Sequence, residues 1–290
     1  MRRMTGVAVG TALATAGLLA TACGSNGSGS ASNQPAPASP AQIVAAAYVK
    51  TTDAKTAKTA INSEISTGGQ SVPVTASGVI DFSAPSADLT ENLPQGAGSL
   101  EVRYLNGFIY EQLPPSLAQQ LGAGKPWISI DASKIAQQQY GASLSQLESS
   151  TPSDPGDQLG YLRGASDHVT TVGKQTIDGA ATTHYTLTLD LDKATANQPA
   201  QAKQAVQKLE QQLGTHTLPA QVWIDDQGRV RKLTLTETMA HPPSTSNGQS
   251  GPITINLTDT MSDFGTPVTD TAPSADQTTD ITDQILSQSH

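Results

Sequence analysis

The chain of 290 residues carries 16 lysines and arginines against 25 aspartates and glutamates, which gives a formal net charge of −9. This acidic balance argues against nucleic acid or an anionic membrane surface as a binding partner, because both would repel the protein. A single cysteine excludes an intramolecular disulfide, and an aromatic content of 4% leaves any cavity to be lined mainly by aliphatic side chains.

The first 22 residues are expected to be a signal peptide. Arg2 and Arg3 provide a positively charged start, and the uncharged apolar run Val7–Leu19 is too short for a lasting membrane span. The small residues Ala20-Thr21-Ala22 directly precede Cys23. A peptidase that binds this backbone in an extended form needs small side chains at these places.

Cys23 is the predicted attachment point of a lipid. The stretch that ends in Cys23 resembles the lipobox of bacterial lipoproteins, in which the cysteine after the cleavage site takes a thioether-linked diacylglycerol. One position departs from that pattern, because Ala20 stands where leucine is usual and Leu19 lies one place further back. The alternative is an ordinary secretory cleavage that leaves a free thiol, which is unusual in a secreted protein.

Residues 23–40 are predicted to be a lipidated flexible tether, and residues 41–290 the folded domain. Gly24–Pro40 is rich in Gly, Ser and Asn and then in Pro and Ala, without charge or periodicity, as in flexible linkers. A short helix over Ala41–Thr51 opens the domain, with Ser39 as its N-cap and Pro40 as its first helical residue.

From Lys55 onward the hydrophobic period changes from 3.6 to two. In Ser71–Phe82 the even positions are apolar or glycine and most odd positions are polar, which predicts a strand with one dry and one wet face. Asn106-Gly107 is the strongest hairpin signal in the chain. The predicted strands are Thr59–Thr67, Ser71–Phe82, Ala87–Leu93, Ser99–Leu105, Phe108–Leu113, Val169–Thr176, Thr183–Leu191, Ala220–Asp225, Arg229–Met239 and Ile253–Met261.

Three further segments lack this alternation. Pro114–Arg163 combines prolines, glycines and isolated apolar residues, and we expect short helices here that pack over the apolar face of the sheet. Such a long segment is typical of a functional cover, and the alternative is a structural cap on a filled core. Lys193–Gly214 is expected to be a surface helix that ends at Gly214, and Asp276–Leu286 a frayed terminal helix in a tail that begins at about residue 274.

These elements predict an α+β fold, with a single highly curved antiparallel sheet and helices that cover its concave face. A concave apolar face must be filled by its own side chains or by a ligand, and Ala76 and Gly78 are expected to leave space there. The alternation predicts a set of cavity-lining residues, each equally compatible with an ordinary core. They are Val74, Ile80, Phe82, Tyr185, Leu187, Leu189, Ile253, Ile255 and Leu257.

The sequence offers no recognisable catalytic arrangement. It contains no G-x-S-x-G, H-E-x-x-H, Walker, G-x-G-x-x-G or C-x-x-C motif. No two histidines have metal-ligand spacing, so we expect no metal site and solvated positions for all of them. We therefore predict a protein that is not an enzyme and that uses no cofactor. The histidines are His168, His184, His216, His241 and His290.

Three stretches carry a resemblance to a known group of proteins. They are V-G-K-Q-T-I-D-G and T-H-Y-T-L-T-L-D-L within Leu162–Leu191, V-W-I-D-D-Q-G-R-V-R-K-L-T-L over Val222–Leu235, and M-S-D-F-G-T-P-V-T-D-T-A-P over Met261–Pro273. With the lipobox-like start, these resemble the actinobacterial LppX/LprA/LprF/LprG lipoproteins, which share the half-barrel fold of the carriers LolA and LolB. The resemblance implies a cavity that holds the acyl chains of lipids or glycolipids.

The expected function is that of a lipoprotein on the extracytoplasmic face of the cell membrane. Its lipid anchor at Cys23 would hold it there, and its cavity would bind a lipid or glycolipid for transport or presentation in the cell envelope. The alternative is a sensor or interaction lipoprotein that partners an envelope signalling protein without carrying lipid.

Overall fold

The computed structural model describes residues 38–84, 86–93, 98–120, 124–140, 157–164, 168–196, 200–240, 251–268 and 271–288. The predicted signal peptide, Cys23 and most of the predicted tether lie outside the described residues.

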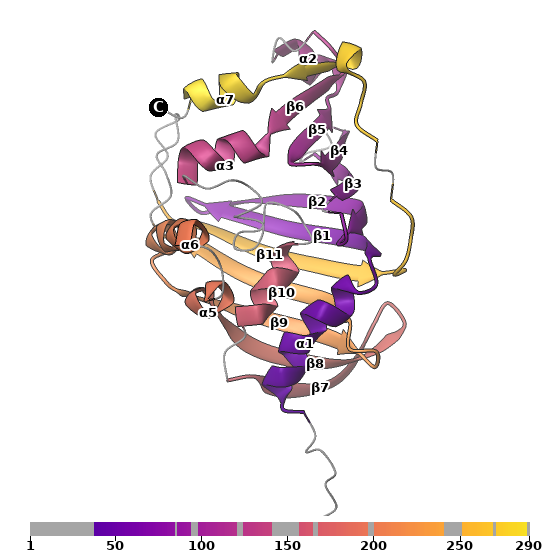
Figure 1. The fold of residues 1–290 in the computed structure, drawn as a ribbon, viewed down its shortest axis with the longest axis vertical. Helices are drawn as coiled ribbons and strands as arrows, with labels where there is room; N and C mark the ends of the chain where they lie inside the picture. The colour runs from indigo at the N-terminus through magenta and orange to yellow at the C-terminus, as the bar shows by residue number, and fades with distance from the viewer. Residues whose placement is uncertain are drawn as a thin grey trace, which may run out of the picture. The chain divides into compact units, whose positions relative to one another are not determined.

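Within this part of the chain, twelve strands form one sheet (Figure 1). The strands are β1 (Thr56–Thr67), β2 (Gln70–Asp81), β3 (Ser86–Asn92), β4 (Ser99–Leu105), β5 (Phe108–Gln112), β6 (Trp127–Asp131), β7 (Thr170–Ile177), β8 (Ala180–Asp190), β9 (Thr217–Asp225), β10 (Val230–Met239), β11 (Ile253–Ser262) and β12 (Thr278–Asp280). Their order across the sheet is β12-β6-β5-β4-β3-β2-β1-β11-β10-β9-β8-β7. All neighbours are antiparallel except β12 and β6.

Short helices accompany the sheet. They are α1 (Pro40–Thr52), α2 (Pro115–Gln120), α3 (Ala132–Tyr140), η2 (Asp157–Gly164), α5 (Leu191–Thr195), α6 (Ala200–Leu213), η3 (Ala275–Gln277) and α7 (Thr282–Gln288), where η denotes a 3-10 helix. Helix α1 begins as predicted, because the Ser39 side chain accepts a hydrogen bond from the Gln42 backbone and the Gln42 side chain bonds back to Ser39. The strand order given above confirms the prediction of a single, mostly antiparallel sheet.

Strands β6 and β12 were not predicted. Trp127–Asp131 is only five residues long and falls in a segment expected to be helical, and β12 has three residues and pairs with β6 far along the chain. Neither strand has a local signal strong enough to separate it from a loop. Their pairing turns the predicted terminal helix Asp276–Leu286 into η3, β12 and α7.

The predicted helix Lys193–Gly214 is also corrected, because it is divided into α5 and α6. Asp190 caps α5 by accepting a hydrogen bond from the Lys193 backbone N–H at 2.9 Å, so this helix begins at Leu191. The helix ends at its C-cap, Ala196, whose backbone N–H donates to the Lys193 carbonyl. Gly214 ends α6 as predicted, with a φ of 70°.

The sheet has an apolar and a polar face, as the alternation predicts. Residues directly opposite each other on neighbouring strands share a face. One such row contains Leu235, Leu257, Ser63 and Val74 from β10, β11, β1 and β2. We call the face that carries this row the apolar face.

Three clusters of buried side chains lie along this arrangement. The largest joins strands β8–β11 to α1, η2, α5 and α6, and includes Val44, Leu162, Leu191 and Val206 from the helices. Figure 1 shows α1 crossing in front of β8–β10, with α5 and α6 near the left-hand ends of the strands. The second cluster is centred on β2–β4 and the third on β4–β6.

Gly78 of β2 does not leave the space that its sequence context predicts. A Cβ atom here would overlap the carbonyl oxygen of Asp88 and would lie 2.8 Å from the Cα atom of Leu89. The backbone of β3 therefore occupies the place of the missing side chain, which is the use of a strand glycine where another backbone approaches closely. The prediction that Gly78 enlarges a cavity is wrong.

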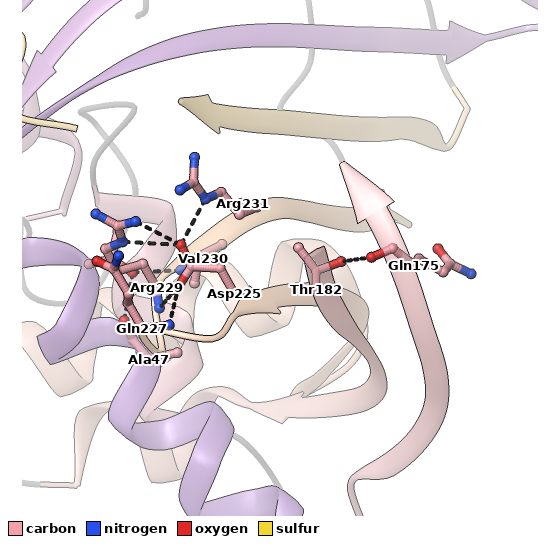
Figure 2. Close-up of polar contacts among 9 residues, drawn as sticks. Ala47, Gln175, Thr182, Asp225, Gln227, Arg229, Val230 and Arg231 are labelled. Carbon is pink, nitrogen blue, oxygen red and sulfur yellow. Dashed lines mark hydrogen bonds and ion pairs between the residues drawn. The ribbon is translucent and has the colours of Figure 1, made fainter. Parts of the chain in front are cut away.

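A polar cluster around Asp225 closes the β9–β10 hairpin, and a neighbouring hydrogen bond joins this hairpin to α1 (Figure 2). The Asp225 carboxylate accepts hydrogen bonds from the Arg229 backbone and guanidinium at 2.9–3.1 Å, and from Arg231 Nε at 2.8 Å. Burial raises the pKa of Asp225, but these hydrogen bonds outweigh it and lower the pKa below the usual value. Directly after Arg229, the backbone N–H of Val230 donates a hydrogen bond to the Thr51 hydroxyl of α1 at 2.9 Å.

Candidate ligand-binding face

All nine predicted lining residues lie on the apolar face or pack with the clusters on it. Four of them are almost completely buried and form part of the core, with exposed fractions of 0–6%: Ile80, Tyr185, Leu187 and Leu189. The other five are half-buried: Val74, Phe82, Ile253, Ile255 and Leu257. Whether any of them contacts a ligand stays a prediction.

Four of these half-buried residues, all but Phe82, belong to an apolar strip on the three neighbouring strands β2, β1 and β11. Register places Ile255 opposite Ile65 and Ile65 opposite Val72, with Leu257 and Val74 in the next row. Val72 is 43% exposed. We call the following set the apolar strip: Ile61, Ile65, Val72, Val74, Ile253, Ile255 and Leu257.

The apolar strip differs from the rest of the apolar face in its incomplete coverage. Strands β8–β10 are buried beneath α1, η2, α5 and α6, with Leu189, Val222 and Leu233 at 0% exposure. At the strip, none of the residues falls in the fully buried class. An incompletely covered row of branched aliphatic side chains is a surface that can take up further apolar atoms.

Four carboxyl groups interrupt the apolar face, and the sequence analysis missed them. Asp259 on β11 is opposite Leu233 and Ile61, and Glu237 on β10 is opposite Ile255. Glu91 on β3 and Glu111 on β5 occupy the corresponding places on the other side of the strip, opposite Leu100 and Val102. The signal was present in the alternation, because each acid stands where the period of two requires an apolar residue.

Asp259 is the most deeply placed of the four. Its side chain has no exposed area, and one carboxylate oxygen accepts a short hydrogen bond from the Thr59 hydroxyl. The other oxygen, Oδ2, is buried without a hydrogen-bond partner. Burial raises the pKa of Asp259 to about 7, against the smaller opposing effects of Thr59 and the Thr260 backbone.

The three glutamates are half-buried. Burial raises the pKa of Glu91 and of Glu237, and burial together with the negative charge of Glu91 raises the pKa of Glu111. None of these three side chains makes a hydrogen bond or ion pair within the described residues. Placing carboxyl groups in this environment costs free energy, because the charged form has lost water without gaining a partner.

The lysine and arginine side chains of the same strands lie away from the apolar face. Lys58, Arg103 and Lys232 occupy the polar face by register, and Lys58 and Arg103 form ion pairs with Asp263 and Glu101 there. Arg231 lies at the irregularity between Val230 and Lys232 and binds Asp225. The described part of the apolar face on β1–β5, β10 and β11 therefore carries negative charge only.

One histidine departs from its predicted solvated position. His184 on the polar face is 7% exposed because its ring stacks on Trp223, with ring centroids 4.1 Å apart, and its Nε2 is 2.9 Å from Gln221 Oε1. A local pattern does not reveal this stack, which depends on the pairing of β8 with β9. His168 and His216 are exposed as expected, and His241 and His290 lie outside the described residues.

Two surface hollows are formed by described residues. One, of about 480 Å³, lies between the end of β5, α2 and the segment before β6, and includes Leu113, Ala118 and Lys125. The other, of about 380 Å³, lies beside the end of α6 and includes Glu210 and His216. Neither includes a predicted lining residue.

Nowhere in the described ranges do three or more His, Cys, Asp or Glu side chains form a group that could hold a metal ion. Among the described helices, none combines the length and apolar character that crossing a membrane requires.

Comparison with known proteins gives one sequence relative of note. No protein-family model matches the chain. An uncharacterised 31.2 kDa protein of Streptomyces griseus, encoded in the rplA–rplJ intergenic region, is 27% identical over 197 residues. The match covers 66% of this chain and 59% of the relative, so it spans less than two thirds of the relative's length.

Comparison with solved structures gives several that align with this chain. Lipoprotein LppX of Mycobacterium tuberculosis aligns with a TM-score of 0.43 at 15% identity, over 79% of this chain and 98% of LppX. LprF of Mycobacterium bovis aligns with a TM-score of 0.42 at 16% identity, over 81% and 97% of the two chains. A LolA superfamily protein of Nitrosomonas europaea aligns at 0.25 and 10% identity, over 80% and 96%. The chain is thus similar in structure to LppX and LprF, and this likeness concerns the fold alone.

Proposed function

We propose that this protein is a membrane-anchored, extracytoplasmic lipoprotein that binds lipid or glycolipid acyl chains. The observation that carries the proposal is the apolar strip, a row of aliphatic side chains on the central strands that the described helices leave incompletely covered. Burying such a surface against an acyl chain is favourable by about 25 cal/mol per Å² of apolar area. A protein exported with this strip open to water gains stability by filling it.

The shape of the binding site is part of the same proposal. We infer that the sheet bends into a half-barrel whose concave side is the apolar face. The close approach of the β3 backbone to Gly78 supports a sharp bend between β2 and β3. The acyl chains then lie along the strip, between the clusters on β8–β11 and on β2–β5.

The anchor is proposed from the sequence. A diacylglyceryl group on Cys23 supplies two acyl chains, whereas a single chain gives only marginal membrane binding. The acidic composition does not contribute attraction to an anionic surface. The tether of residues 23–40 then lets the domain reach lipid near the membrane.

The test is mass spectrometry of organic extracts of the full chain, purified from membranes of its native host. The variant Val74→Thr/Ile255→Thr keeps the branched shape of both side chains but places hydroxyls on the strip. The matched control is Asn62→Thr/Ser77→Thr on the polar faces of β1 and β2.

We expect stoichiometric lipid in the parent chain and in the control, and at least a tenfold loss in the strip variant, since each unpaired hydroxyl costs about 1–3 kcal/mol. Parent protein without lipid contradicts the proposal. Recovery of one stoichiometric envelope protein in place of lipid supports the alternative of an interaction lipoprotein.

A further inference from the structure

The four carboxyl groups of the apolar face form two flanks around the apolar strip. One row across the sheet runs Leu233, Asp259, Ile61, Ala76, Glu91 and Leu100 from β10 to β4. Three strand spacings separate Asp259 from Glu91, which is about 14 Å. Glu237 lies beyond Asp259 on the neighbouring β10, and Glu111 beyond Glu91 on β5. Any ligand on the strip therefore lies between acids.

Asp259 provides an independent indication that this face can accept a hydrogen-bond donor. A buried carboxylate usually satisfies both oxygens, because an unsatisfied buried polar atom costs free energy. Asp259 has no exposed area, yet Oδ2 has no partner while Oδ1 is bonded to Thr59. An orphaned acceptor on the apolar face is a place for a hydrogen-bond donor.

The chemistry of these four groups selects the ligand. When ionised they accept hydrogen bonds only, and when protonated they also donate one. With no lysine or arginine on the described apolar face of β1–β5, β10 and β11, an anionic head group would meet carboxyl groups and no cation from these strands. Hydroxyl and ammonium groups, in contrast, supply the donors that the carboxyls lack.

We propose that the ligand of the apolar strip is an amphiphile whose polar part donates hydrogen bonds, through hydroxyl or ammonium groups, and carries no negative charge. Glu91, Glu111, Glu237 and Asp259 are the residues that determine this specificity. The inference rests on the proposed function, because it requires that an acyl chain occupies the strip. It excludes anionic phospholipids and free fatty acids as preferred ligands.

The test compares three probes that share one acyl length: 1-oleoylglycerol, oleylamine and oleate. Each is titrated calorimetrically at pH 8, below its aggregation concentration, into the delipidated full chain. Like-charge repulsion at about 10 Å in a protein environment predicts that oleate binds at least tenfold more weakly than 1-oleoylglycerol. Oleylamine is expected to bind at least as tightly as 1-oleoylglycerol.

The variant Glu91→Gln/Glu111→Gln removes two charges and keeps the side-chain shape. It is expected to reduce the oleate penalty about tenfold, and Glu237→Gln reduces it further. The control is Glu64→Gln, an equal loss of charge at an exposed position on the polar face of β1, which leaves the ratio unchanged. Thermal unfolding of each variant verifies that it is folded.

The results separate the two proposals. Equal binding of all three probes, or a preference for oleate, overturns the specificity inference while lipid binding stands. An oleate penalty that the glutamine variants leave intact also overturns it, since the penalty then arises elsewhere. Failure of all three probes to bind overturns both the inference and the proposed function.

Discussion

Asp259 makes a specific prediction about stability and pH. Its carboxyl group has a pKa of about 7 in the folded protein against 3.8 in an unfolded chain, because burial disfavours the charged form. The folded protein therefore binds more protons than the unfolded chain between these two values. The free energy of unfolding must fall as the pH rises through this interval and level off above pH 7.

The magnitude follows from the two pKa values. Each pH unit between them is worth about 1.4 kcal/mol, so Asp259 destabilises the protein by about 4 kcal/mol at pH 8. About 3 kcal/mol of this destabilisation develops between pH 5 and pH 8. Glu91, Glu111 and Glu237 act in the same direction, since burial raises the pKa of each. Asp81 and Asp225 have lowered pKa values, so they make the free energy of unfolding rise with pH. They do so only at and below the usual aspartate pKa, outside the interval from pH 5 to pH 8.

Asp259→Asn removes the titrating group while keeping its shape. Urea unfolding of the parent chain and the variant at pH 5 and pH 8 measures the effect. We expect the parent chain to lose several kcal/mol between the two pH values and the variant to lose about 3 kcal/mol less. Asp226→Asn, at an exposed turn position, is the control and keeps the parent profile. A parent chain as stable at pH 8 as at pH 5 would refute the raised pKa of Asp259.

Three further predictions follow from other contacts. Gly78→Ala places a Cβ against the β3 backbone and should lower the free energy of unfolding, measured in urea, by about 2 kcal/mol. Gly160→Ala, at a position with open space around it, should lower it far less. Equal losses would argue against the close approach of β3. Asp225→Ala leaves Arg229 and Arg231 without their shared acceptor and should cost about 3 kcal/mol, and a loss below 0.5 kcal/mol would show that the cluster does not hold the hairpin. Cys23→Ala should release the folded domain into the medium when expressed in the native host, and a variant that stays in the membrane fraction would mean that another element anchors it.

The elements that alternate strongly were predictable from the sequence. The hairpin turns at Gly68-Gly69 and Asn106-Gly107 adopt the positive φ values that such turns require, from 54° to 80°. Strands β1–β5 and β7–β11 were predicted with boundary errors of a few residues. The cap of α1 was likewise readable, because Ser39, Pro40 and Gln42 are local signals.

The remaining features depend on contacts between distant segments. Strand β12 exists because Thr278–Asp280 meets Trp127–Ser129, about 150 residues earlier, and no window of local sequence contains both. The buried position of His184 requires Trp223 from the next strand in the sheet. Gly78 was misinterpreted because a missing side chain does not show whether a backbone or a cavity takes its place.

The candidate site was predictable in part. Alternation assigned Val74, Ile255 and Leu257 to the apolar face, but it could not separate them from fully buried residues such as Leu189, because coverage depends on where the helices pack. Glu91, Glu111, Glu237 and Asp259 are breaks in that same alternation and were open to discovery from the sequence. The structure alone shows that the three glutamates and the Oδ2 atom of Asp259 have no hydrogen-bond partner within the described residues.

A crystal structure of the full chain, purified from its native host without delipidation, tests the central claim most directly. The proposed function predicts electron density for an acyl chain within about 4 Å of Ile65, Val74 and Ile255, with hydroxyl or ammonium groups near the carboxyl side chains. An apolar strip closed by the protein's own side chains, with no density for a bound amphiphile, would contradict it.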